Sequence, residues 1–259
     1  MRRLAEYQDR AYARLYLNRL MPIREGDAQA GAGGRLLAAT ARQLALRMSY
    51  EDVIRVAQAK IDPARFARIT HEHGVTPKQI FTVTEFLKPG VDELCSILPT
   101  WLAGGVVSLA RRFPALGRAH YSMAVNSRSV SGYLRFVLLA SLRPFRRGTY
   151  RFRQEQDAIE AWLQLIVEAA AHSGEFAIEI AECAGLIKGY GDTHRRGSAN
   201  YDAIAARVIA PALAGAMPVG PADAVASARA AALLDPDGEA LAKCLAELER
   251  APAHAIAAE

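Results

Sequence analysis

The spacing of apolar residues along most of this chain follows the period of an α-helix. Between residues 155 and 171, for example, Ile159, Trp162 and Ile166 recur at intervals of three and four, which places them on one face of a helix. The pattern predicts helices at 2–20, 35–48, 50–60, 63–73, 91–112 with a break at Pro99, 129–142, 155–171, 175–187, 201–213, 221–234 and 239–250. The predicted fold class is therefore mainly α, a multi-helix orthogonal bundle.

Prolines, glycines and capping residues predict where these helices begin and end. Pro22 and the loop at 24–34 end the first helix, and Gly74 ends the fourth. Ser49 is a suitable N-cap residue, and Asp52, three residues later, completes an acidic variant of the capping box. The third helix is therefore expected to start at residue 50.

Residues 79–87 are an exception to the helical pattern. Within them, residues 81–85 alternate apolar and polar side chains and are rich in β-branched residues, which is typical of a strand. A second, weaker strand pattern lies at 119–125. The two segments predict at most a small two-stranded β ribbon.

The length and composition are those of a globular protein with a sizeable core. The chain has 259 residues, of which 51% are hydrophobic and 23% charged. We expect a single helical domain at 1–250, with 1–75 and 76–250 as possible sub-lobes. The alanine-rich tail at 251–259 is expected to fray.

The net charge of +5 is unevenly distributed along the chain. From Leu94 to Gln154 there are ten arginines and no acidic residue, whereas from Asp202 to the end eight acids outnumber four bases. The molecule is therefore expected to have a basic side and an acidic side.

The cysteines and the apolar runs bear on the cellular location. Cys95, Cys183 and Cys244 are too far apart in sequence for a zinc or iron–sulfur motif, and their odd number argues against a secreted disulfide framework. The longest uncharged run, 94–110, contains Pro99 and is too short to span a membrane. We expect buried free thiols, no metal site and a soluble cytoplasmic protein.

A glycine-rich, basic segment between two predicted helices is the strongest candidate for chemistry. Its glycines tolerate positive φ, so that successive N–H groups could form an anion-binding nest before a helix that begins near Ser198. The candidate ligand- or partner-binding residues are Lys188, Gly189, Tyr190, Gly191, Asp192, Thr193, His194, Arg195, Arg196 and Gly197. We call these ten residues the corner motif.

The corner motif also has a purely structural interpretation. Glycine commonly ends a helix, and Asp192, Thr193 or Ser198 could cap the next one. His194, beside two arginines, is expected to be a structural or binding residue rather than a general base. No catalytic residue is predicted.

A second basic segment, at 143–153, has five arginines and three aromatic residues. Arginines contact phosphates and aromatic rings stack on bases, so a nucleic-acid interface is one interpretation. A solvated or partner-facing surface is the preferred interpretation, and electrostatic docking to an acidic protein or to another domain would need the same charges. The predicted basic docking surface consists of Arg143, Arg146, Arg147, Arg151 and Arg153, placed in a loop between helices.

Four segments together resemble a known family. They are Thr84-Glu-Phe-Leu-Lys-Pro-Gly90, Ser129-Val-Ser-Gly-Tyr-Leu-Arg135, Arg143-Pro-Phe-Arg-Arg147 and, most specifically, Ile187-Lys-Gly-Tyr-Gly-Asp-Thr-His-Arg-Arg-Gly197. In sequence and order they resemble the C-terminal region of the indolepyruvate:ferredoxin oxidoreductase beta subunit and of related fused 2-oxoacid oxidoreductases. The resemblance covers roughly residues 6–210.

This resemblance implies a component of an enzyme that oxidatively decarboxylates arylpyruvates to acyl-coenzyme A. The complete enzyme would use thiamine diphosphate, iron–sulfur clusters, coenzyme A and ferredoxin. The Rossmann-like catalytic domain that precedes this region in the family, the thiamine-diphosphate motif and the ferredoxin-type cysteine cluster are not in this sequence. The chain is therefore expected to bind no cofactor alone, and to be an excised domain or a separately encoded half.

Three functional hypotheses follow. The first is an accessory helical domain, inactive alone, whose partners are a thiamine-diphosphate-binding subunit, the 2-oxoacid oxidoreductase catalytic domain and ferredoxin. The second is a free-standing helical module that binds an anionic or phosphorylated ligand at the corner motif. The third, a nucleic-acid-binding protein, predicts binding that weakens steeply with salt.

Overall fold

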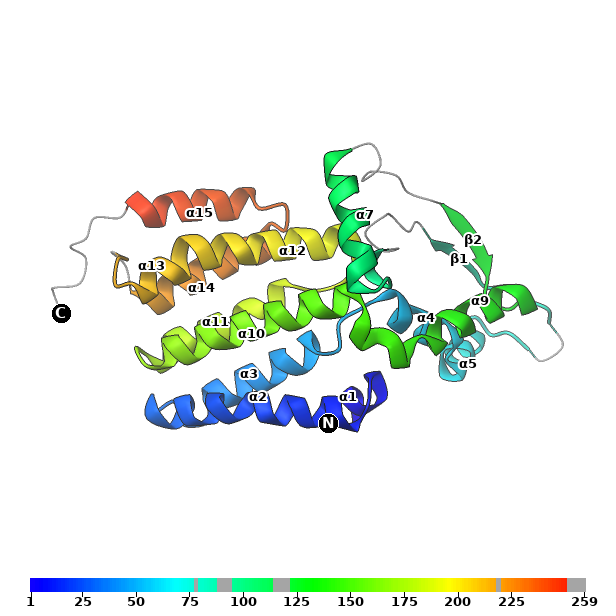
Figure 1. The fold of residues 1–259 in the computed structure, drawn as a ribbon, viewed down its shortest axis with the longest axis horizontal. Coiled ribbons are helices and arrows are strands. Elements are labelled where there is room, and N and C mark those ends of the chain that lie inside the picture. The colour runs from blue at the N-terminus through cyan, green and yellow to red at the C-terminus, as the bar shows by residue number, and fades with distance from the viewer. Residues whose placement is uncertain (77–78, 88–94, 114–121, 218–219, 251–259) are drawn as a thin grey trace. The chain divides into compact units, whose positions relative to one another are not determined.

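The computed structural model of the chain describes residues 1–76, 79–87, 95–113, 122–217 and 220–250. Over these ranges the protein is mainly helical, and its one sheet has two antiparallel strands (Figure 1), as predicted. The chain divides into two compact units: unit 1 consists of residues 1–50 and 156–259, and unit 2 of residues 51–155. The predicted tail at 251–259 lies outside the described residues.

The described elements of unit 1 are all helices. They are α1 (Arg2–Tyr7), α2 (Arg10–Gln29), α3 (Arg35–Arg47), most of α10 (Tyr150–Ala170), α11 (Gly174–Cys183), α12 (Gly191–Ile204), α13 (Ala210–Leu213), α14 (Pro221–Leu234) and α15 (Glu239–Arg250). A short 3-10 helix (Ala184–Leu186) follows α11, and a π-helical turn (Ala205–Ile209) joins α12 to α13. Helix α3 packs against α2 and α11, and α14 packs against α11 and α15.

The core of unit 1 contains large side chains that are almost fully buried, among them Trp162, Tyr12 and Phe176. The Trp162 indole N–H donates a hydrogen bond to the backbone oxygen of Ile180 at 3.0 Å, so the one polar group of this side chain is satisfied. The apolar stripe that predicted the helix at 155–171 is thus a core face of α10.

Helix α2 differs from the prediction because it continues through Pro22 to Gln29. The predicted end at Pro22 was wrong because tertiary contacts outweigh the loss of one helical hydrogen bond at proline. Ile23 and Gly26 are buried beyond the proline. Asp27 then accepts hydrogen bonds from the backbone N–H groups of Gly34 at 2.6 Å and Leu36 at 2.9 Å, which holds the start of α3 against the end of α2.

Unit 2 combines shorter helices with the sheet. Its elements are α4 (Val53–Ile61), α5 (Pro63–Glu72), β1 (Thr84–Leu87), α7 (Thr100–Arg112), β2 (Met123–Asn126), α9 (Val130–Ser141), a 3-10 helix (Arg143–Gly148) and the first turn of α10. Helix α4 packs along α9. The small core between α4, α9 and the sheet includes Ala57, Val125 and Phe136.

The β ribbon forms where it was predicted, with strand boundaries shifted toward the C-terminus. Thr84 pairs with Asn126 and Leu87 with Met123. The first strand begins at Thr84 instead of Gln79, and part of the second predicted strand, 119–121, lies outside the described residues. Ser127 extends this pairing, because its backbone N–H donates to the oxygen of Val83 at 2.8 Å.

The N-cap of α4 was assigned to the wrong residue. Asp52, rather than Ser49, caps this helix by accepting a hydrogen bond from the Arg55 N–H at 2.6 Å. The Ser49 hydroxyl donates to the backbone oxygen of Ala45 at 2.7 Å, at the end of α3. The helix therefore begins at Val53, and its cap is a carboxylate, which the helix dipole also favours at this end.

None of the helices in the described ranges has the length and apolar character that crossing a membrane requires. All three cysteines are free. Cys95 and Cys183 are buried, as expected, whereas Cys244 is only partly buried.

Candidate functional site

The connection between the two helices at the corner motif is shorter in the structure than in the prediction. Helix α12 begins at Gly191, so only Ile187, Lys188, Gly189 and Tyr190 connect it to the 3-10 helix after α11. The expected helix start near Ser198 was wrong, because Asp192 to Arg196 carry no helix-breaking residue and place an acid in the positive first turn. Seven residues of the motif, Gly191 to Gly197, are therefore helical.

The three glycines of the motif have two different roles. Gly189 and Gly191 have φ of +72° and +57°, the left-handed region that glycine adopts without steric cost. Gly197 does not have positive φ. A Cβ atom at Gly197 would lie 2.2 Å from the backbone oxygen of Leu186, so this position needs glycine because α12 crosses the preceding segment at close range.

The charged side chains of the motif are mostly paired. Arg195 forms an ion pair with Asp192, one turn before it, and Arg196 forms one with Asp237 at 2.5 Å. The Nδ1 atom of His194 lies 3.4 Å from the Ser198 hydroxyl oxygen. The two arginines are thus partly neutralised by protein carboxylates, which weakens the expected anion site.

Lys188 and Tyr190 remain as the outward-facing part of the motif. Both are exposed, Tyr190 by 63%, and Lys188 forms no ion pair with any residue that the structure describes. No side chain caps α12, so the first N–H groups of this helix point outward without an intrahelical partner. A cation, an aromatic ring and a helix N-terminus therefore lie together on the surface.

The buried thiol nearest this corner is not a nucleophile. Burial raises the pKa of Cys183, the last residue of α11, to about 12, and the nearby Arg229 only partly opposes this effect. A thiol with this pKa is protonated at neutral pH and unreactive. Burial likewise raises the pKa of the Tyr201 hydroxyl above its ordinary value.

The predicted basic docking surface at 143–153 requires a correction, because Arg146 is not on the surface. Its side chain is 0% exposed, and its Nε and Nη2 donate to the two carboxylate oxygens of Asp52 at 2.7 and 3.2 Å. The sequence did not reveal this pair, because its partners are 94 residues apart. One of the five arginines is therefore a structural element of unit 2.

The other four arginines lie on helices instead of in a loop. Arg143 and Arg147 are exposed on the 3-10 helix, and Arg153 is exposed on α10. Arg151 is half-buried and pairs with Glu155, one turn later, at 2.6 Å. The exposed part of the predicted docking surface is therefore Arg143, Arg147 and Arg153.

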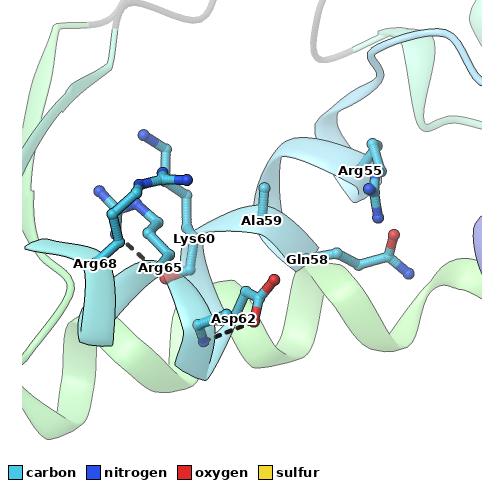
Figure 2. Close-up of a pocket in the computed structure, with 8 residues that line it drawn as sticks. Arg55, Gln58, Ala59, Lys60, Asp62, Arg65 and Arg68 are labelled. Carbon is cyan, nitrogen blue, oxygen red and sulfur yellow. Dashed lines mark hydrogen bonds between the residues drawn. The ribbon is translucent and has the colours of Figure 1, made fainter.

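A basic groove that the sequence did not indicate lies on α4 and α5. Its volume is about 350 Å³. Its lining residues are Arg55, Gln58, Ala59, Lys60, Asp62, Ala64, Arg65 and Arg68. In Figure 2, Lys60, Arg65 and Arg68 gather at one end of the groove, and Arg55 and Gln58 lie at the other.

The charges of this groove are only partly balanced. Glu85, a buried residue of β1, pairs with Lys60 at 2.5 Å and with Arg65. Arg68 is 3.7 Å from Glu72 in an exposed pair, whereas Arg55 forms no ion pair with a described residue. The groove can therefore attract an anion, and the spacing of Lys60, Arg65 and Arg68 is the signal in the sequence that could have indicated it.

Comparison with known proteins gives a family without a known activity. The model of a family of unknown function, DUF6537, matches residues 1–207. The chain belongs to this family. No curated protein and no solved structure matches it.

The DUF6537 match includes all of unit 2 and the whole corner motif, and it ends within the π-helical turn after α12. All three surfaces described above therefore lie in the family region. No group of three or more His, Cys, Asp or Glu side chains suited to a metal ion occurs among the described residues.

Proposed function

We propose that this DUF6537 chain is a helical accessory domain of a thiamine-diphosphate- and iron–sulfur-dependent 2-oxoacid oxidoreductase of the indolepyruvate type, and that it is inactive alone. This proposal rests on the segment at 187–197. It supplies the most specific part of the resemblance to that family, and it presents exposed Lys188 and Tyr190 beside the start of α12.

In the segments that resemble that family, some residues are required by the packing of this chain, whereas others are exposed and have no role in packing. Gly197 permits a close crossing in unit 1, and in unit 2 a Cβ atom at Gly132 would lie 2.0 Å from the backbone oxygen of Asn126. Arg146 holds Asp52. These residues have structural reasons for being present. Lys188 and Tyr190 have no such role in packing and are available for contact with a partner protein.

The cofactors would be held by the partner chain. Iron–sulfur clusters need several thiolates at one place, whereas this chain has only three cysteines, of which Cys95 and Cys183 are buried. We therefore place thiamine diphosphate, the clusters and coenzyme A on a thiamine-diphosphate-binding catalytic subunit that passes electrons to ferredoxin. This chain would bind and orient that subunit in the cytoplasm, where free thiols stay reduced.

Reconstitution tests this proposal. The catalytic subunit of an indolepyruvate-type oxidoreductase from the same organism would be assayed for arylpyruvate- and coenzyme-A-dependent reduction of a viologen dye, with and without this chain. We expect a complex in size-exclusion chromatography and a rise in activity that saturates at equimolar chain. Lys188→Ala/Tyr190→Ala should weaken the complex at least about tenfold. Neither association nor a change in activity would refute the accessory role.

The second candidate function is free-standing binding of an anion. The groove on α4 and α5 is a better site for it than the corner motif, because the arginines of the corner motif are paired with carboxylates. Calorimetric titration of the chain with coenzyme A tests both sites. Binding that Arg55→Ala/Arg68→Ala abolishes would place the anion in the groove, and binding that Lys188→Ala/Tyr190→Ala abolishes would place it at the corner. No heat at millimolar coenzyme A would exclude autonomous binding of this ligand.

A further inference from the structure

Helix α9 has an apolar surface on more than one side. Toward α4 it buries Phe136, and Leu139 and Ala140 pack partly buried against the same core. Gly132 faces the backbone of Asn126 at close range. This inner face packs α9 against α4 and the small core of unit 2.

A second apolar row runs along the outside of α9. Val130, Leu134 and Leu138 are spaced by four residues and are exposed by 79%, 57% and 68%, so they lie one above another on one side of the helix. A helix that is apolar on all sides is normally buried on all sides. The outer row therefore has the composition of a covered surface.

Two residues of this row, Val130 and Leu134, form one wall of a groove, and Leu138 continues the row along α9 beyond it. Val130, Tyr133 and Leu134 line it together with Phe66 of α5 and residues 127–129, the turn before α9. The groove has a volume of about 420 Å³. An apolar groove between two helices, with anchors four residues apart, suits an amphipathic helix with anchors at the same spacing.

The charges around the groove are positive. Arg128 lies at its edge, with its guanidinium 3.9 Å from the centre of the Phe81 ring. Arg135 is exposed on α9 and has no ion pair among the described residues. No acidic residue occurs in the sequence from Leu94 to Gln154. A helix in the groove would therefore be favoured by acidic side chains along its flanks.

We infer that the groove between α5 and α9 binds an acidic amphipathic helix of another protein, with Val130, Leu134 and Leu138 as its apolar contacts and Arg128 and Arg135 as its charge contacts. This partner need not be the oxidoreductase subunit. The site also differs from the corner motif, which belongs to unit 1.

Peptide selection tests this site without knowledge of the natural partner. A random-peptide library displayed on phage would be selected on the full chain, with removal of peptides that also bind the Leu134→Ser/Leu138→Ser variant. We expect enriched sequences with apolar residues every three or four positions and a net negative charge. Enriched peptides that are neutral or basic, or no enrichment over the variant, would overturn the proposal.

The best enriched peptide, synthesised with a fluorescent label, would then be titrated against single variants. Leu134→Ser should weaken binding at least about tenfold, and Arg135→Glu should weaken it about threefold or more and reduce its salt dependence. Leu234→Ser, the same change at an exposed leucine of unit 1, is the matched control and should leave binding unchanged. Because both leucines are exposed, circular dichroism should show both variants folded.

Self-association of the chain through this groove would contradict the proposal. If the wild-type chain is a dimer in sedimentation and Leu134→Ser/Leu138→Ser makes it a monomer, a second copy covers the groove, and the acidic-partner proposal is wrong. A monomeric wild-type chain that binds the acidic peptide supports it.

Discussion

The two units of this protein differ in how completely they cover their own apolar residues. Unit 1 buries Trp162, Tyr12 and Phe176 within stacked helices. Unit 2 leaves Trp101, Phe86, Phe145 and the outer row of α9 exposed, and its described core is small. Extended exposed apolar surfaces commonly mark binding sites. The comparison indicates that unit 1 has the larger buried core, whereas unit 2 exposes large aromatic side chains and the outer row of α9.

Charge follows the same division. Unit 2 has sixteen Lys and Arg residues against eight Asp and Glu residues, a net charge of +8, so the rest of the chain, with the total at +5, has −3. Exposed apolar side chains in a strongly basic unit favour an acidic partner over self-association, because like charges on two copies repel.

The largest expected difference between the units comes from truncation of tryptophan. Trp162→Ala should lower the free energy of unfolding by about 3–5 kcal/mol, because it leaves a cavity and removes a satisfied indole. Trp101→Ala, at a site that is 81% exposed in unit 2, should change it by less than about 0.5 kcal/mol. Urea denaturation monitored by circular dichroism measures both. Equal effects would contradict the view that unit 1 holds the main core.

The ion pairs provide a second comparison. Asp52→Ala leaves the buried guanidinium of Arg146 without its carboxylate and removes the cap of α4, so we expect a loss of about 3–5 kcal/mol. Asp192→Ala breaks an exposed pair with Arg195 on α12 and should cost less than about 1 kcal/mol. Urea midpoints distinguish the two. A small effect of Asp52→Ala would mean that Arg146 has sufficient other partners.

Two glycines should respond to alanine with opposite signs. Gly197→Ala, in unit 1, places a methyl group against the Leu186 backbone oxygen and should destabilise the protein by about 1–3 kcal/mol. Gly104→Ala, inside α7 of unit 2, meets no atom within 4 Å and should stabilise that helix by up to about 1 kcal/mol. Thermal melting gives the sign of each change. Stabilisation by Gly197→Ala would disprove the close crossing.

The smallest expected effect is a pH dependence caused by Cys183. Because its pKa is about 12 in the folded protein and about 8.5 in an unfolded chain, the unfolded state releases this proton first. Stability from this group is present below about pH 8.5 and falls as the pH rises, by about 1 kcal/mol at pH 9.5. Urea midpoints at pH 8 and 9.5 measure it. Cys183→Ala should remove this part of the decline, and an unchanged slope would show that the thiol does not cause it.

The sequence alone determined the helical character of the protein and the position of most of its elements. The helices at α3, α14 and α15 and the ribbon of β1 and β2 follow from local periodicity and β-branching, because these signals act between residues that are neighbours in sequence. Asymmetry of charge was also visible, since it needs only counting.

Tertiary structure alone decided the continuation of α2 through Pro22, the burial of Arg146 and the need for glycine at position 197. In each case the deciding atoms are distant in sequence or lie on another element. The start of α3 donates a hydrogen bond to Asp27 of α2, Asp52 pairs with Arg146, and the Leu186 oxygen lies opposite Gly197. Local propensities of about 1 kcal/mol or less are outweighed by such packing and ion-pair energies. For this reason the corner motif was found from the sequence, whereas the pairing of its Arg196 with Asp237 and the groove between α5 and α9 were not.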